Sequence, residues 1–138
     1  RKYRILNMKE KEESITVGLN ENNSSVAYQL GRLFSLLEKV QRDALGENIN
    51  ASIRDRYFGA ASATPGAVFP LLLRLSRHHV SKSQYGELVD RKIQDVLNKL
   101  DAFPSHLNLE EQGQFILGYY HQNQANYSKN ENIDKKEG

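Results

Sequence analysis

Cationic side chains gather in the middle of the chain, where few acids accompany them. Between residues 49 and 82 there are five lysines and arginines but only one acid, Asp55. Four side chains would share one side of a helix, because they fall at positions i, i+3, i+4 and i+8: Arg74, Arg77, His78 and Lys82. Groups of this kind hold phosphate oxygens. The spacing predicts a surface for a polyanion, although the exposed face of any helix is commonly charged.

A second group lies earlier in the same window. Asn50, Arg54 and Tyr57 are spaced i, i+4 and i+7, and Arg56 adds a further cation. An amide and a guanidinium can bind phosphates, and nucleic-acid bases stack on a tyrosine ring or an arginine plane. Together the two groups predict these nucleic-acid-binding residues: Asn50, Arg54, Arg56, Tyr57, Arg74, Arg77, His78 and Lys82.

Other chemistries find little support in the sequence. His78 and His79 are adjacent, so in a helix they point about 100 degrees apart and cannot share a metal ion. The acids pair with nearby lysines and arginines, the glycines form no phosphate loop, and cysteine is absent. We therefore predict no catalytic residues, no metal and no cofactor. Tyr119, Tyr120 and His121 could line a partner surface, but aromatic residues near a helix end more often belong to core and rim.

The first two helices are predicted from periodicity and end signals. After Ser24 or Ser25, apolar residues recur at spacings of 4, 3, 4, 3 and 4 from Val26 to Ala44, and Gly46 is a plausible stop. Glu38 and Arg42 would pair on this helix. Asn50 is expected to cap a second, shorter helix that runs to about residue 63.

Three more helices follow in the prediction. Thr64 and Pro65 start a third helix, and its apolar run 68–75 suggests the centre of a bundle, with Pro70 kinking it or delaying its start. A fourth helix spans about 84–100. Asn108 and Glu111 resemble a capping box that opens a fifth, with Phe115, Ile116 and Tyr119 inward and tight contacts at Gly113 and Gly118.

These elements predict an all-α fold, a single small bundle of about five helices. A chain of 138 residues can bury one modest core. We expect an extended N-terminal arm over 1–23, in which 15–19 could form a short strand, then the bundle over 24–126 and a flexible tail over 127–138. No apolar run suits a membrane span or a signal peptide, so a cytoplasmic protein is expected. The segment 83–126 carries a net charge of −3, from three cations and six acids.

Several stretches resemble the C-terminal region of the type I-C CRISPR-associated large subunit. The most specific is N-A-S-I-R-D-R-Y-F-G-A-A-S-A-T-P at 50–65. The others are A-Y-Q-L-G-R-L-F at 27–34, F-P-L-L-L-R-L-S-R-H-H at 69–79, L-D-A-F-P-S-H-L at 100–107 and L-E-E-Q-G-Q-F-I-L-G-Y-Y-H-Q at 109–122. The resemblance covers about residues 26–124, and the two ends of the chain match no pattern of that family.

The resemblance implies a role inside an assembly. In that family the C-terminal helical domain is also made alone, from an internal start, as the small subunit of the RNA-guided surveillance complex Cascade. The implied partners are the large subunit, the backbone subunits, further copies of the chain, and the target and non-target DNA strands, with guide RNA contacted indirectly. Pairing with the guide RNA reads the DNA sequence, so such a subunit needs to contact only the sugar–phosphate backbone and the overall shape of the nucleic acid. The alternative is a structural spacer whose arginines pair with acids of neighbouring subunits and never meet DNA.

Overall fold

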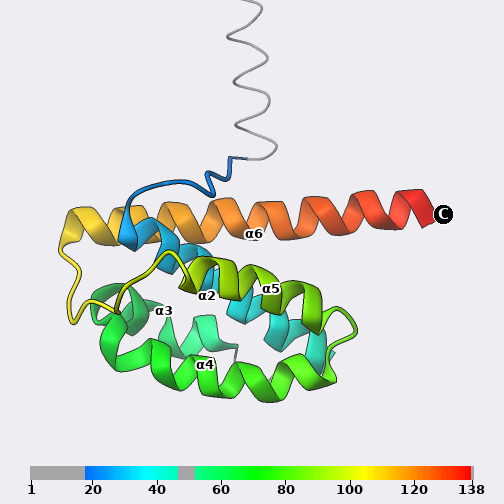
Figure 1. The fold of residues 1–138 in the computed structure, drawn as a ribbon, viewed down its shortest axis with the longest axis horizontal. Coiled ribbons are helices and arrows are strands. Elements are labelled where there is room, and N and C mark those ends of the chain that lie inside the picture. Colours follow the sequence, from blue (N-terminus) through cyan, green and yellow to red (C-terminus); the bar gives the residue numbers. More distant parts are fainter. Residues whose placement is uncertain (1–17, 47–51, 138) are drawn as a thin grey trace, which may run out of the picture.

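The computed structural model describes residues 18–46 and 52–137, which form helices and no strand. In the labels of Figure 1 the helices are α2 (Val26–Leu45), α3 (Ile53–Ala63), α4 (Pro65–Lys82), α5 (Gly86–Leu97) and α6 (Leu109–Glu137). The predicted all-α bundle of about five helices is therefore confirmed.

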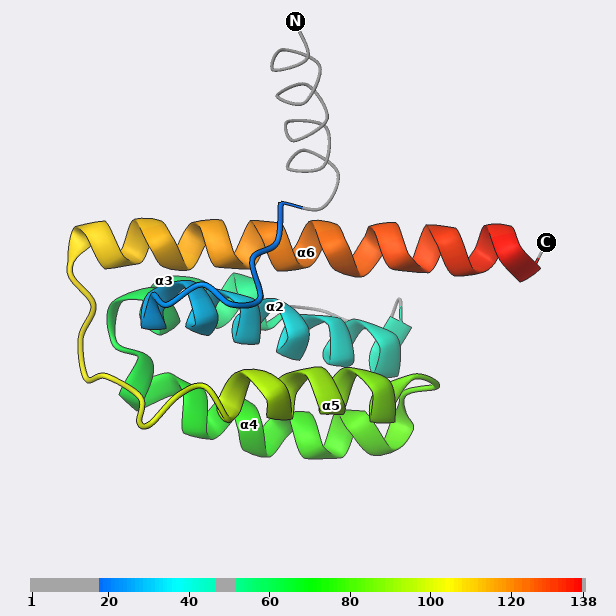
Figure 2. The same cartoon turned by 45° about the horizontal axis from the view of Figure 1, so that its top comes forward.

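Helix α2 is the centre of the bundle. It lies between α6 on one side and α4 with α5 on the other (Figure 2). Its leucine stripe is buried, and so are polar residues off that stripe, among them Arg32 and Glu38. The prediction that the apolar run 68–75 forms the central helix is wrong. Helix α4 buries one side only and exposes Pro70 and Leu75, because none of the described helices covers its outer side.

Aromatic rings from four helices meet at Phe34 of α2. Its ring makes edge-to-face contacts with four others, at centroid distances from 5.4 to 6.4 Å: Phe58, Phe69, Phe115 and Tyr119. Such pairs add about 0.5 to 1.5 kcal/mol each to the stabilisation that burial provides. The aromatic cluster therefore ties α3, α4 and α6 to the central helix.

Helices α2 and α6 approach each other closely at two glycines. A Cβ atom at Gly31 would lie 2.0 Å from the carbonyl oxygen of Phe115, and one at Gly118 would lie 2.0 Å from that of Tyr28. Each position admits only glycine, because the clashing atom belongs to the other helix's backbone. The tight contact predicted at Gly118 is confirmed. The one predicted at Gly113 is wrong, since a Cβ there would meet open space.

Local signals set most helix ends. Gly46 caps α2 with a φ of 58°, a region that glycine enters without strain. Pro65 begins α4, and Asn108 and Glu111 exchange the two hydrogen bonds of a capping box at the start of α6. Helix α3 differs from the prediction, because its N-cap is Ser52, which forms a capping box with Asp55.

Three other predictions concern the ends of the chain and the faces of α6. The arm over 1–23 and its possible strand lie largely outside the described residues, and 18–23 contain no strand. The predicted boundary at 127 is not a helix end, because α6 runs on to Glu137. Phe115 and Tyr119 point inward as predicted. Ile116 is 41% exposed, because the inward side of α6 follows positions 115, 119 and 122.

Candidate nucleic-acid interface

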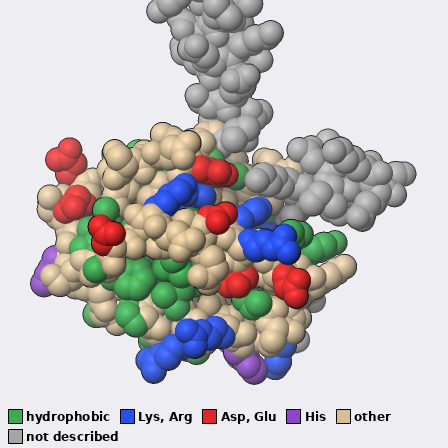
Figure 3. All heavy atoms as spheres, in the orientation of Figure 1, with side chains coloured by type: hydrophobic (Ala, Val, Ile, Leu, Met, Phe, Trp, Pro, Cys, Tyr) green, Lys and Arg blue, Asp and Glu red, His purple; other side chains and the backbone are tan. Residues whose placement is uncertain are grey.

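The basic row of α4, defined as Arg74, Arg77, His78 and Lys82, lies on the outer side of that helix. The inner side is set by four buried residues spaced i, i+1, i+4 and i+8: Val68, Phe69, Leu72 and Ser76. At 100 degrees per residue the row falls opposite this buried side. All four of its side chains are exposed. Figure 3 shows lysine, arginine and histidine side chains gathered over α4 at the lower edge of the molecule.

The charge of the basic row is not neutralised by the described part of the chain. The ion pairs found there are Lys39 with Asp43 and Arg42 with Glu38, and both lie within α2. His79 adjoins the row but adds little charge at neutral pH. Partial burial lowers the pKa of His79, and the neighbouring His78 and Lys82 lower it further. Two guanidinium groups and an ammonium group are thus left to attract an anionic partner.

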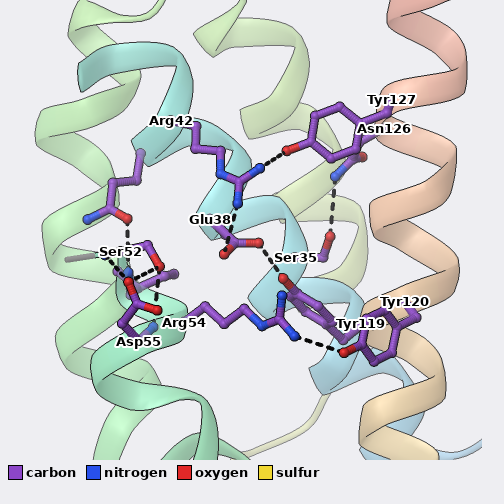
Figure 4. A network of polar contacts seen from close by, with 12 residues as sticks. Ser35, Glu38, Arg42, Ser52, Arg54, Asp55, Tyr119, Tyr120, Asn126 and Tyr127 are labelled. Atoms are coloured by element: carbon purple, nitrogen blue, oxygen red, sulfur yellow. Dashed lines mark hydrogen bonds and ion pairs between the residues drawn. The ribbon is translucent and has the colours of Figure 1, made fainter. Parts of the chain in front are cut away.

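The residues predicted on the second helix are not brought into this row. Arg54 is exposed, but it points toward α6, where its Nη2 donates a hydrogen bond of 2.8 Å to the hydroxyl of Tyr120 (Figure 4). Arg56 is also exposed, whereas Tyr57 is half-buried and packs against the core. Asn50 lies outside the described residues. Of the eight predicted site residues, the structure therefore gathers only the four on α4.

A second arginine contacts α6 in the same manner, and the sequence reasoning missed it. Nη1 of Arg42 on α2 donates a hydrogen bond to the hydroxyl of Tyr127, and the guanidinium carbon of Arg42 lies 5.9 Å from the centre of that ring. Tyr120 and Tyr127 are seven residues apart on α6, a spacing that places them on one side of a helix. That spacing could have indicated a shared tyrosine face on α6. It could not have indicated the arginine partners, because these come from α2 and α3.

Glu38 is buried beside these pairs. Its Oε1 accepts a hydrogen bond of 2.5 Å from the hydroxyl of Tyr119, while its Oε2 has no hydrogen bond and lies 3.9 Å from Nη2 of Arg42. The pKa of Tyr119 is raised, first by burial and then by the hydrogen bond to this carboxylate. The hydroxyl of Tyr119 therefore stays protonated and serves as the donor that compensates a buried charge.

Arg32 is a second buried charge on α2. Its Nε donates to Gln122 at 3.0 Å, and its Nη1 donates to Gln29 at 2.7 Å. Burial lowers the pKa of Arg32, while Glu21 and Asp95 act in the opposite direction. It lines a hollow of about 270 Å³ together with residues of α5 and α6. This arginine therefore joins α2 to α6 through the side-chain amide of Gln122, while Gln29 lies on α2 itself.

The described residues form neither a metal site nor a membrane-spanning helix. Within residues 18–46 and 52–137, no three histidine, aspartate or glutamate side chains gather closely enough to hold a metal ion. None of the described helices is long and apolar enough to cross a membrane.

Comparison with known proteins places the chain in a family. No curated protein sequence matches it significantly. The profile of the family described as CRISPR-associated protein (Cas_Csd1) matches residues 1–127, which include the basic row of α4 and most of α6. The expectation that the N-terminal end matches no pattern of that family is therefore wrong. Because the match spans most of the sequence, the chain belongs to the CRISPR-associated protein family Cas_Csd1.

Proposed function

We propose that the chain is a non-catalytic, cytoplasmic subunit of an RNA-guided surveillance complex, type I-C Cascade, and that it stabilises DNA strands in the R-loop. Its protein partners are the large subunit, the backbone subunits and further copies of itself, and guide RNA is contacted indirectly. The observation that carries this proposal is the basic row of α4, which is exposed and makes no ion pair with any described residue.

The chemistry of the row suits a nucleic-acid backbone. Arginine and lysine contacts to phosphate fix the position of a strand but carry no sequence information. In an RNA-guided complex the guide supplies the sequence reading, so a subunit that holds the displaced or paired strand needs only such contacts. Because the chain belongs to a CRISPR-associated family, DNA is favoured as the partner of the basic row over other polyanions.

The experiment is a salt titration of DNA binding by the assembled complex. Replacing Arg74 or Arg77 with alanine removes one phosphate contact each. We expect the slope of log K against log salt to flatten by about 0.9 per contact on duplex and by about 0.7 on a single strand. The loss of affinity should be the same for unrelated target sequences.

Arg91→Ala is the matched control, because this exposed arginine lies on α5, within the acidic segment. Its salt slope should equal that of the wild type. Unchanged slopes for both α4 variants would remove DNA contact at the basic row from the proposal.

A structural spacer is the second candidate, favoured by the opposite charges of 49–82 and 83–126. A basic face of one copy can dock on the acidic face of the next, in a head-to-tail contact. In that case Arg74→Ala and Arg77→Ala would release subunits from the complex in native mass spectrometry. The complexes that remain intact would keep wild-type DNA affinity.

A further inference from the structure

Two tyrosine–arginine pairs form a surface on α6 that is separate from the basic row of α4. We call it the α6 pair surface and define it as Tyr120 with Arg54, and Tyr127 with Arg42. Figure 4 shows both arginines reaching from α2 and α3 to the tyrosine hydroxyls. Seven residues of helix separate the two rings, which is about 10 Å along the axis. Helix α6 meets α4 only inside the core, where the rings of Phe69 and Phe115 pack edge to face, and the backbones of the described parts of the two helices do not come close.

The two rings are both accessible and held in place. Tyr120 is 47% exposed and Tyr127 is 37% exposed, whereas the neighbouring Tyr119 is buried. Each hydroxyl accepts a hydrogen bond from an arginine, and each ring lies within 6 Å of a guanidinium carbon. A ligand that stacks on these rings would therefore lose little side-chain entropy in ordering them.

The pair surface also carries positive charge. The guanidinium of Arg54 makes no ion pair with a described residue. Arg42 has one carboxylate nearby, Glu38, but that group is buried and already accepts a hydrogen bond from Tyr119. Lys39 lies 5.9 Å from the centre of the Tyr127 ring and is paired with Asp43. The exposed charges beside the two rings are thus mainly cationic.

We infer that the α6 pair surface binds single-stranded nucleic acid by stacking bases on Tyr120 and Tyr127 while Arg54 and Arg42 hold the adjoining phosphates. Exposed aromatic rings alternating with cations are the combination that such sites use, and a duplex would keep its bases out of reach. The inference rests on the proposed function for the choice of a nucleic-acid partner. The two surfaces differ in chemistry, because the α6 pair surface has exposed tyrosine rings and the basic row of α4 has cations alone.

The test compares two oligomers of equal length, oligothymidylate and an abasic strand that has the same phosphates but no bases. Tyr120→Leu and Tyr127→Leu should each weaken thymidylate binding about fivefold or more, the loss expected for one stacked base. They should leave abasic binding nearly unchanged. Tyr120→Phe and Tyr127→Phe are matched controls that lose the hydroxyl but keep the ring, and they should retain most of the affinity.

Tyrosine fluorescence gives a second readout, because the chain contains no tryptophan. Thymidylate should quench the emission of the wild type, and the double leucine variant should lose most of that quenching. Circular dichroism on each variant separates a binding loss from unfolding. The inference is overturned if the leucine variants lose both oligomers equally, if the phenylalanine variants lose as much as the leucine variants, or if the wild type prefers neither oligomer.

Arg77→Ala distinguishes this inference from the proposed function. It should weaken both oligomers by the same factor, because a phosphate contact is indifferent to the base. Arg77→Ala could have no effect while the leucine variants weaken the binding of thymidylate alone. That result would contradict DNA contact at the basic row and support the α6 pair surface. If Arg77→Ala weakens both oligomers and the leucine variants show no selective loss of thymidylate binding, the basic row is supported and the α6 pair surface is contradicted.

Discussion

At the scale of single residues, the buried carboxylate of Glu38 depends on one tyrosine hydroxyl. A charge in a helical core is costly unless hydrogen bonds compensate it, and Tyr119 supplies the bond of 2.5 Å. Arg42 lies near enough to add an attraction but is partly exposed and also contacts Tyr127. Tyr119 therefore connects the polar interior to the α6 pair surface through its neighbour in sequence, Tyr120.

The raised pKa of Tyr119 makes a prediction about alkaline pH. Its hydroxyl binds a proton more tightly in the folded than in the unfolded chain, where the pKa is about 10. The resulting stabilisation is complete below pH 10 and is lost as the pH rises above it, by at most about 1.4 kcal/mol per pH unit. We expect the free energy of unfolding of the wild type to fall more steeply above pH 10 than that of Tyr119→Phe.

Urea denaturation at intervals between pH 9 and pH 11 checks this expectation. Parallel curves for the two proteins would contradict it. Tyr119→Phe should also be less stable than the wild type at pH 7, because Glu38 then loses the hydrogen bond to its Oε1.

At the scale of elements, the contact between α2 and α6 holds the candidate surfaces in place. Backbone approaches backbone at Gly31 and Gly118. Two hydrogen bonds join the same two helices, one from Arg32 to Gln122 and one from Tyr119 to Glu38. The arginines of the α6 pair surface come from α2 and α3, so its geometry depends on this packing.

Replacing two glycines of α6 with alanine should distinguish the effect of close helix packing on stability from the effect of helix propensity. A Cβ in Gly118→Ala would lie 2.0 Å from the carbonyl oxygen of Tyr28, so α2 and α6 must move apart. We expect the free energy of unfolding of Gly118→Ala to fall by about 3 kcal/mol or more, the upper end of the cost of overpacking. Gly113→Ala is the matched control on the same helix, because its Cβ meets open space.

The control should be stabilised by about 0.5 to 1 kcal/mol, since alanine favours a helix more than glycine does. Chemical denaturation of both variants measures the two effects. Equal changes in stability would show that α2 and α6 are not in close contact at Gly118.

At the scale of the whole molecule, the two candidate surfaces lie on different sides of α2. Helix α4 carries the basic row on its outer side, and α6 carries the tyrosine–arginine pairs on the opposite side of α2 (Figure 2). A short strand cannot span both surfaces at once. The chain should therefore offer two separate sites.

Native mass spectrometry with thymidylate hexamers at low salt can count these sites. We expect up to two hexamers on the wild-type chain. A variant that combines Arg74→Ala with Arg77→Ala should keep one of them, and so should one that combines Tyr120→Leu with Tyr127→Leu. Saturation of the wild type by a single hexamer would contradict the separation of the two surfaces.

The resemblance at 50–65 and at four other stretches predicts a CRISPR-associated family, and the family match over 1–127 confirms that prediction. The type of complex and the role of a small subunit stay predictions.

Local sequence determined the helices, most of their ends and the side of α4 that faces solvent. A helix start or stop depends on hydrogen bonds among neighbours, as Gly46 and the pair Asn108 and Glu111 show, and a face follows from a period of 3.6 residues. This is why the basic row of α4 could be predicted from spacing alone.

Tertiary structure decided the remaining features. It made α2 the central helix and left Ile116 and Gly113 without close neighbours. It also directed Arg54, predicted in the second group of nucleic-acid-binding residues, toward Tyr120 of α6. The pairs of Arg54 with Tyr120 and Arg42 with Tyr127 join residues 66 and 85 positions apart. Local spacing carries no information about such contacts, because they depend on how whole helices pack against one another.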